Sequence, residues 1–173
     1  MKGPDPEPRQ GRLERYGEVQ SALAALLADE TDFIAALATT ACELHYAFDH
    51  YDWTGFYRLV RPDLLVIGPY QGTHGCLRIA VTRGVCGAAV RSRATQRVDR
   101  VADRPDHIAC SSSTRSEIVV PVVSRQRGVL AVLDVDSNRE AAFTDVDQSA
   151  LEDICRDLAE RFPFGDAHRA GPT

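Results

Sequence analysis

Five cysteines are the residues of this chain best suited to chemistry: Cys42, Cys76, Cys86, Cys110 and Cys155. A thiolate is a nucleophile, and a helix N-terminus lowers the pKa of a thiol because its free N–H groups stabilise the anion. On local electrostatics alone Cys86 is the first candidate nucleophile, since GVCGAAVR (84–91) has the pattern of a short helix opened by a glycine. The alternative is that each cysteine is a small buried packing residue, and Cys42 and Cys155 lie beside apolar helical stripes that favour it.

Three acidic residues interrupt two of the most apolar segments of the chain. Asp134 and Asp136 alternate in one segment and therefore share one face of a strand, and Glu117 opens the segment before it. Clustered carboxylates are costly to bury, so at least one should have a raised pKa and could donate a proton, while its charged neighbours could hold a cation. The alternative is that these acids lie in water at a strand end, or pair with Arg78 or Arg115.

A metal site could be imagined from His107 together with Cys76, Cys86 and Cys110. The spacings of these residues include no paired step of the kind that zinc sites use. The sequence also contains no glycine-rich phosphate loop. We therefore expect neither a metal nor another cofactor.

The elements that must position these residues follow from hydrophobic periodicity. Helices are expected over 13–28, from Thr31 or Asp32 to 48, over 84–91, and from Thr144, which with Asp147 makes a capping-box pattern, to 162. Strands are expected over 53–59, 64–68, 77–81, 95–98, 117–123 and 128–135. Pro121 predicts a bulge or an edge in its strand. Residues 99–115 form a long polar loop, and loops of that length are often functional.

Length and composition indicate one folded domain. The chain has 173 residues, of which 44% are hydrophobic and 26% charged, which is ordinary for a globular protein. Runs of hairpins flanked by helices indicate an α+β fold with an antiparallel sheet. We expect a single domain over 13–162, a disordered proline-rich tail over 1–12 and a flexible C-terminal tail over 163–173.

Charge and hydropathy exclude several classes of function. A formal net charge of −5 does not favour a nucleic-acid-binding protein. No apolar stretch is long enough for a membrane span, and the N-terminus lacks the pattern of a signal peptide. We therefore expect a cytoplasmic protein with reduced thiols, in which any disulfide would be catalytic or redox-sensing.

The sequence resembles the free methionine-(R)-sulfoxide reductases, which are stand-alone GAF-domain enzymes. The resemblance rests on YDWTGFYRL (51–59), LVIGPYQG (65–72), CLRIAVTRGVCG (76–87), HIACSSSTRSEIVVPV (107–122), VLDVDS (132–137) and AAFTDVD (141–147), and it runs from about residue 30 to 162. It implies a GAF fold with a six-stranded antiparallel sheet, flanking helices and a ligand pocket. It also implies an oxidative-stress enzyme that reduces free methionine-(R)-sulfoxide with electrons from thioredoxin, and it suggests a homodimer.

The resemblance assigns roles that overrule the electrostatic argument for Cys86. It implies that Cys110 is the catalytic cysteine, Cys76 the main resolving cysteine and Cys86 an additional resolving thiol. One of Glu117, Asp134 and Asp136 would protonate the sulfoxide oxygen, and the others would hold the substrate ammonium. Trp53 and Tyr57 would form an aromatic wall for the methylthio group, although plain core packing is the alternative for Trp53.

Some points stay open at the level of sequence. Ser111 stands where the family commonly has an aspartate, Gly75 where it usually has alanine, and Ala80 where it usually has proline. Neither the acid that carries the proton nor the main resolving thiol is decided. Competing readings are a non-catalytic GAF sensor of a small molecule and a thiol redox switch, but a switch would not need the three acids.

Overall fold

The computed structural model of this chain describes residues 9–104 and 113–165. Its helices are α1 (Arg9–Leu26), α2 (Phe33–Ala47), α3 (Gly84–Ser92) and α4 (Asp145–Arg161), with a short 3-10 helix at Val101–Asp103. Its strands are β1 (Trp53–Arg61), β2 (Leu64–Gln71), β3 (Arg78–Ala80), β4 (Gln96–Val98), β5 (Ser116–Ser124) and β6 (Gly128–Ser137). Every element expected from the sequence is present, and the ends shift by a few residues.

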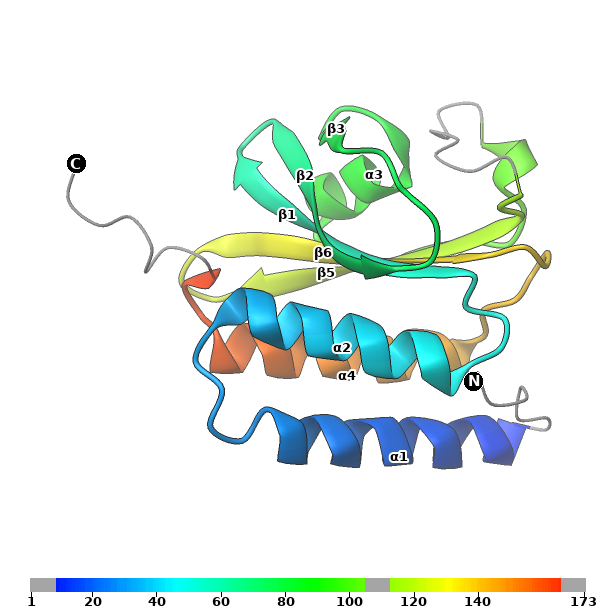
Figure 1. Ribbon diagram of the computed structural model, residues 1–173. Helices are drawn as coiled ribbons and strands as arrows, with labels where there is room; N and C mark the ends of the chain where they lie inside the picture. The colour runs from blue at the N-terminus through cyan, green and yellow to red at the C-terminus, as the bar shows by residue number, and fades with distance from the viewer. Residues whose placement is uncertain (1–8, 105–112, 166–173) are drawn as a thin grey trace.

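The strands form one antiparallel sheet in the order β3-β2-β1-β6-β5-β4. Helices α2 and α4 pack on one face of the sheet, α1 lies outside them, and α3 covers the opposite face (Figure 1). The expected α+β class with a six-stranded antiparallel sheet is confirmed. None of the helices in the described ranges is long and apolar enough to cross a membrane.

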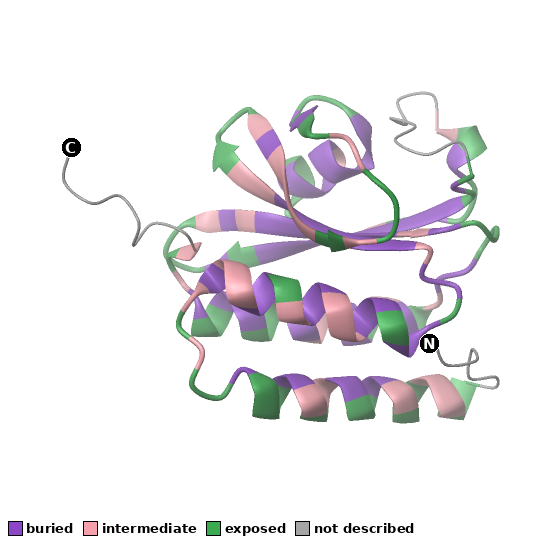
Figure 2. Ribbon diagram, in the orientation of Figure 1, coloured by how far each residue is buried: buried purple, intermediate pink, exposed green. Residues whose placement is uncertain are grey.

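The larger core fills the space between the sheet and the helices α2 and α4 (Figure 2). Leu37 and Leu44 of α2 and Leu151 of α4 are fully buried against Leu133 of β6. Each such side chain contributes about 1.5–3 kcal/mol to stability. Asp32 caps α2 by accepting a hydrogen bond from the backbone N–H of Ala35 at 3.0 Å. This core forms a rigid support for the opposite face of the sheet.

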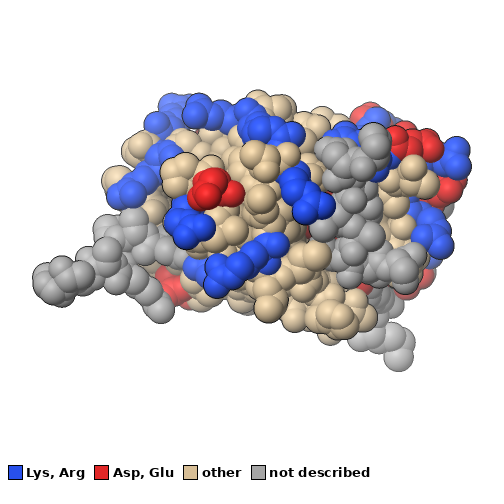
Figure 3. All heavy atoms as spheres, turned by 90° about the horizontal axis from the view of Figure 1, so that it is seen from above, with Lys and Arg blue, Asp and Glu red and all other residues tan. Residues whose placement is uncertain are grey.

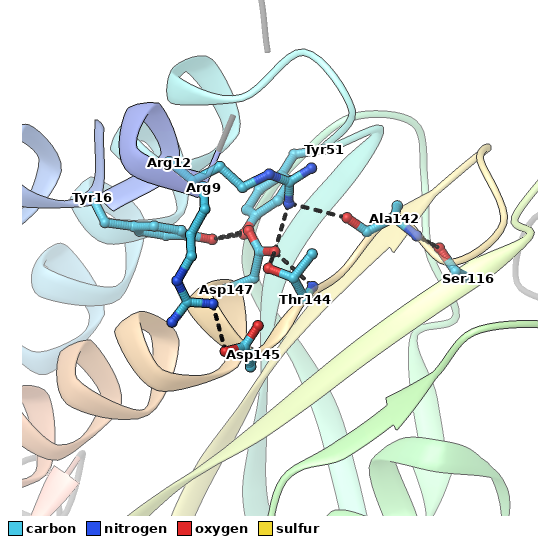
Figure 4. A network of polar contacts seen from close by, with 9 residues as sticks. All are labelled: Arg9, Arg12, Tyr16, Tyr51, Ser116, Ala142, Thr144, Asp145 and Asp147. Carbon is cyan, nitrogen blue, oxygen red and sulfur yellow. Dashed lines mark hydrogen bonds and ion pairs between the residues drawn. The ribbon is translucent and has the colours of Figure 1, made fainter. Parts of the chain in front are cut away.

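Helix α1 is held to this core by a buried polar network (Figure 4). Asp147 is fully buried, and it accepts hydrogen bonds from Arg12 at 2.5 Å and from the hydroxyl of Tyr16 at 2.8 Å. The same carboxylate accepts from the backbone N–H of Thr144 at 2.7 Å, which completes the expected capping box. The expectation of a disordered tail over 1–12 is therefore wrong from Arg9 onward, because this network and the packing of Tyr16 order the helix; residues 1–8 lie outside the described residues.

Pro121 is accommodated where its strand lacks one neighbour. Strand β5 lies between β6 and β4, but β4 pairs only with Glu117–Val119. The side of Pro121 that faces β4 therefore lies beyond the end of that strand, where the missing N–H costs no sheet hydrogen bond. The pairing with β6 shifts one residue later, between Val122 and Val123. Both the edge and the irregularity that the proline predicted are present.

Candidate active site

Strand pairing brings an aromatic residue and two acids into one row across the sheet. Asp136 of β6 pairs with Trp53 of β1 on one side and with Glu117 of β5 on the other. Directly paired residues point to the same face of a sheet, so the three side chains share the face that α3 covers. Residues far apart in the chain are thus neighbours because of the register of three strands.

A second row lies two residues away along the same strands. Asp134 pairs with Gly55 of β1, and Gly55 also pairs with Tyr70 of β2. A Cβ atom at Gly55 would lie 2.4 Å from Cβ of Tyr70 and 2.6 Å from Cη2 of Trp53. Because glycine leaves this space open, the rings of Trp53 and Tyr70 stack across it with centroids 5.5 Å apart. Gly55 therefore allows Trp53, a member of the aromatic wall, to stack on Tyr70 above the acids.

A pocket opens between this face of the sheet, the start of α3 and the segment before β3. Six of the eight predicted site residues line it: Trp53, Tyr57, Cys86, Glu117, Asp134 and Asp136. Cys76 directly follows Gly75, which also lines the pocket. Cys110 lies outside the described residues, as do His107 and Ser111. Of the predicted site residues that the structure describes, six therefore line one pocket and Cys76 lies next to it.

The aromatic wall is fixed by contacts on both sides. The rings of Trp53 and Tyr57 stack with centroids 5.8 Å apart, and the indole N–H of Trp53 donates to the carbonyl of Thr73 at 2.9 Å. Gly75 packs close to the same rings, since a Cβ there would lie 3.0 Å from Oη of Tyr57. The two readings of Trp53 are compatible, because its side chain is buried and also lines the pocket.

The acids are buried rather than placed in water at a strand end. Glu117 is 5% exposed and Asp134 is 6% exposed, so for these two the solvated alternative is wrong. Burial raises the pKa of Asp134, and the charges of Asp136 and Glu117 raise it further. Burial likewise raises the pKa of the Asp136 carboxyl, with smaller effects from Glu117 and Asp52. Both effects favour the protonated form of these carboxyls, which is the form that can donate a proton.

One oxygen of the cluster is buried without a hydrogen-bond partner among the described residues. Oδ1 of Asp134 is buried and accepts no hydrogen bond from the part of the chain that the structure describes. Oδ2 of the same residue accepts a hydrogen bond from the thiol of Cys86 at 3.5 Å. A buried oxygen without a donor is costly, and a substrate ammonium or hydroxyl would remove that cost.

Cys86 has a raised pKa, contrary to the helix-terminus argument. The thiol does lie in the first turn of α3, but burial raises its pKa and the nearby Asp134 and Glu117 carboxylates add to the effect. A protonated thiol is a poor nucleophile. The electrostatic choice of Cys86 as nucleophile is therefore wrong, because sequence proximity to a helix N-terminus did not reveal the acids on the facing strands.

Cys76 is in a disulfide bond, whereas Cys42, Cys86 and Cys155 are free thiols. The default of reduced thiols therefore fails at Cys76. A disulfide in a chain expected to have reduced thiols is predicted to be catalytic or redox-sensing. Cys76 is half-buried and lies beside the pocket wall, which is a position suited to such a role.

One set of possible metal ligands exists in the described residues, and it differs from the set considered in the sequence. Ligand atoms of Cys86, Glu117 and Asp134 all lie within 4.8 Å of one another. These are the same groups that form the acid cluster of the pocket. A thiol and two carboxylates are acceptable ligands for zinc. The same groups can also bind an organic cation such as an ammonium.

Sequence reasoning missed several pocket residues, among them Thr73, His74 and Thr114. They come from irregular segments, where no periodicity predicts the direction of a side chain. Thr73 and His74 precede Cys76, and Thr114 precedes Glu117, so closeness to predicted site residues was the one available signal.

The fold and this site define a GAF domain: the family profile of the GAF domain matches residues 27–161, and the chain belongs to that family. The free methionine-R-sulfoxide reductase of Escherichia coli is 41% identical over 147 residues, which is 85% of this chain and 88% of the relative. Within the GAF family, the chain therefore belongs to the free methionine-R-sulfoxide reductases, which are oxidoreductases.

Solved structures agree with this assignment. The free methionine-R-sulfoxide reductase from Neisseria meningitidis, in complex with its substrate, is 40% identical with a TM-score of 0.85, and the match covers 99% of both chains. A substrate complex of the enzyme from Staphylococcus aureus is 36% identical with a TM-score of 0.78, covering 84% of this chain and 94% of that one. The expected resemblance is confirmed over almost the whole chain.

Proposed function

We propose that this chain reduces free L-methionine-(R)-sulfoxide to methionine, with thioredoxin as the reductant. The observation that carries the proposal is the cluster of Glu117, Asp134 and Asp136 on the pocket floor beneath the stacked rings of Trp53 and Tyr57. Acids suit the ammonium of a free amino acid, and aromatic rings suit its methylthio end. Relatives named for this substrate support the same activity.

In the first chemical step the Cys110 thiolate attacks the sulfur of the sulfoxide. The sulfoxide oxygen needs a proton, and a protonated carboxyl of the cluster would supply it. The raised pKa values of Asp134 and Asp136 support this role. The oxygen passes from the substrate sulfur to Cys110, so methionine leaves and a cysteine sulfenic acid remains. The substrate sulfur gains two electrons and the cysteine sulfur loses them.

In the second step Cys76 condenses with the sulfenic acid and water leaves, which gives an intramolecular, redox-active disulfide. The disulfide-bonded state of Cys76 supports its role as the resolving cysteine. Thioredoxin then reopens the bond by thiol–disulfide exchange and is itself oxidised. Cys86, which is a buried free thiol with a raised pKa, would be an auxiliary resolving thiol rather than the main one.

The proposal includes a cytoplasmic location and a homodimer. Leu13 and Leu26 on α1 are 47% and 57% exposed, and a second copy would cover such side chains. We expect light scattering after size exclusion to give the mass of two chains. A monomer mass at every concentration tested would remove the dimer from the proposal and leave the chemistry untouched.

Thioredoxin-coupled oxidation of NADPH tests the activity directly. We would offer free methionine-(R)-sulfoxide, the free (S) epimer and an N-blocked (R) form to the purified protein. Turnover with the free (R) form alone supports the proposal and the ammonium role of the acids. Turnover with the blocked form would contradict the ammonium role, and no turnover with any of them would favour a small-molecule sensor.

Two variants test the roles assigned to the site residues, and a third is the control. Cys110→Ser should abolish turnover, and Asp136→Asn should lower kcat about 100-fold or more, since general acid catalysis is worth about 10²–10⁴-fold. Cys42→Ser is the matched control, because it removes a free thiol on α2 away from the pocket. Full activity of Asp136→Asn would show that the acid assignment is wrong.

A further inference from the structure

Positive charge is concentrated on one part of this acidic protein. The chain carries a formal net charge of −5, yet residues 58–97 contain a single acidic residue, Asp63. The same segment contains seven arginines: Arg58, Arg61, Arg78, Arg83, Arg91, Arg93 and Arg97. It forms the end of β1, the strands β2, β3 and β4, and helix α3, which covers the pocket side of the sheet (Figure 1).

These arginines lie at the surface. Arg58 is half-buried, and the other six are exposed. The view down on this side of the molecule shows basic side chains spread across the face (Figure 3). Arg58 and Arg97 pair with Ala131 and Ile118 of the larger core, so they point to the face of the sheet that α2 and α4 cover. We call the surface made by the other five arginines of residues 58–97 the basic face. Its charge is opposite in sign to that of the whole chain, so it creates a local field that favours anionic partners.

An exposed apolar residue lies in the same segment, directly after the disulfide. Leu77 is 71% exposed and follows Cys76. The backbone carbonyl of Leu77 accepts a hydrogen bond from the N–H of Ile67 at 3.1 Å, which fixes this stretch against β2. Its side chain is therefore presented to solvent by an ordered backbone. Burying a large apolar side chain of this kind under a docked partner is favourable, and this one lies beside the disulfide.

We propose that the basic face and Leu77 form the docking surface for an acidic protein dithiol that reduces the Cys76 disulfide. This inference rests on the proposed function, since it concerns the reductant of the same catalytic cycle. Leu77 would be the apolar anchor beside the sulfur that must be reached, and the arginines would attract and orient the partner. The partner is inferred to be acidic because its negative charge would complement the positive charge of the basic face.

The substrate alone does not account for the basic face. A free amino-acid sulfoxide is a zwitterion without net charge, so the field of the basic face would not accelerate its approach. A macromolecule with a negative surface gains from this field, because electrostatic steering raises association rates by about 10–10³-fold. The second reactant of the catalytic cycle is the protein that supplies electrons, and this protein can carry the negative charge.

Thiol–disulfide exchange on this surface takes place in two steps. One thiolate of the partner attacks Sγ of Cys76, the Cys76 disulfide bond breaks, and a mixed disulfide forms between Cys76 and the partner. The sulfur released from Cys76 departs as a thiolate. The second thiolate of the partner then attacks the partner's own sulfur, which frees Cys76 and leaves the partner as a disulfide. Two electrons pass from the partner to this protein.

The test compares a protein reductant with a small one. We would measure kcat/KM for an acidic thioredoxin, and separately turnover with dithiothreitol, in Arg78→Glu/Arg83→Glu and in Leu77→Ser. None of these residues lines the pocket. The matched controls are Arg125→Glu and Val123→Ser, which change an exposed arginine and a 38% exposed apolar side chain near the hairpin between β5 and β6.

We expect the charge reversal to lower kcat/KM for thioredoxin about 10-fold or more at low salt, with a loss that shrinks at high salt. Leu77→Ser should lower it by a similar factor that does not depend on salt. Turnover with dithiothreitol should stay within about 2-fold of the unchanged protein, because a small neutral dithiol needs no docking surface.

Three results would overturn the inference. Equal losses in the control variants would show that no particular face is used, and equal losses with dithiothreitol would place the defect in the pocket. Failure of the proposed function looks different, because the unchanged protein would then be inactive with both reductants. Glutathione serving as well as thioredoxin would likewise reject a protein partner.

Discussion

The thiol of Cys86 lies 3.5 Å from Oδ2 of Asp134, and both side chains are buried. This contact joins the first turn of α3 to the centre of β6, the two elements that enclose the pocket. Ionising both groups would place two negative charges at this short distance, and such charges repel each other. The thiol therefore keeps its proton and donates a hydrogen bond to Oδ2 of Asp134.

The first prediction concerns the reactivity of this thiol. In the native protein at pH 7–8 we expect Cys86 to resist alkylation by iodoacetamide, because burial and the neighbouring carboxylates raise its pKa. Cys155, whose pKa is raised by burial, should resist in the same way, and both should react once urea unfolds the chain. Peptide mass spectrometry measures the label at each site. Labelling of Cys86 as fast in the native as in the unfolded protein would contradict the assignment.

The second prediction concerns Asp134 and pH. Because burial raises the pKa of Asp134 above its ordinary value of 3.8, the native state keeps a proton that the unfolded chain releases as pH rises. The contribution of this group to the free energy of unfolding therefore falls above about pH 4. An asparagine stays neutral, so Asp134→Asn should gain stability over the unchanged protein, by up to about 1.4 kcal/mol per pH unit within the window.

Urea unfolding between pH 4 and 8 checks this difference. The control is Asp63→Asn, which changes an exposed acid in the turn between β1 and β2 and should show little pH dependence. A difference between Asp134→Asn and the unchanged protein that is constant across this range would show that Asp134 is ionised throughout.

The third prediction concerns the attachment of α1. Arg12→Met leaves the carboxylate of Asp147 buried without its cation, and breaking a buried pair costs about 3–5 kcal/mol. Arg9→Met is the matched control, because the Arg9–Asp145 pair on the same two helices is largely exposed and such pairs are worth little (Figure 4). Urea unfolding should show a lower midpoint for Arg12→Met alone. Equal midpoints for the two variants would refute a structural role for the Arg12–Asp147 pair.

The fourth prediction concerns the aromatic wall. An alanine at Gly55 would place its Cβ within 2.6 Å of Trp53 and closer still to Tyr70, so the stack must move. We expect Gly55→Ala to raise KM for the sulfoxide about 5-fold or more, because the methylthio group packs on that wall. Gly17→Ala is the control, since nothing lies within 4 Å of a Cβ there and the change should stabilise α1 by about 0.5–1 kcal/mol. An unchanged KM would show that Trp53 serves packing alone.

Local chemistry made much of the fold predictable. Asp32 and Thr144 cap helices that the sequence predicted to start there, because a capping side chain bonds only within its own turn. The hairpins β1–β2 and β5–β6 were predicted for the same reason, since apolar runs joined by a short turn are contained in a few residues. The start of α1 was placed too late, because Arg12 is ordered by Asp147, which lies 135 residues away.

The sequence by itself determined which residue types could do chemistry and which face of β6 would carry Asp134 and Asp136, because side chains alternate along any strand. Only the tertiary structure decided that Glu117 and Trp53 join them, since register between strands is set by the packing of the whole sheet. The protonation of Cys86 was decided in the same way. A pKa depends on burial and on charges contributed by distant segments, and those exist only when the chain has folded.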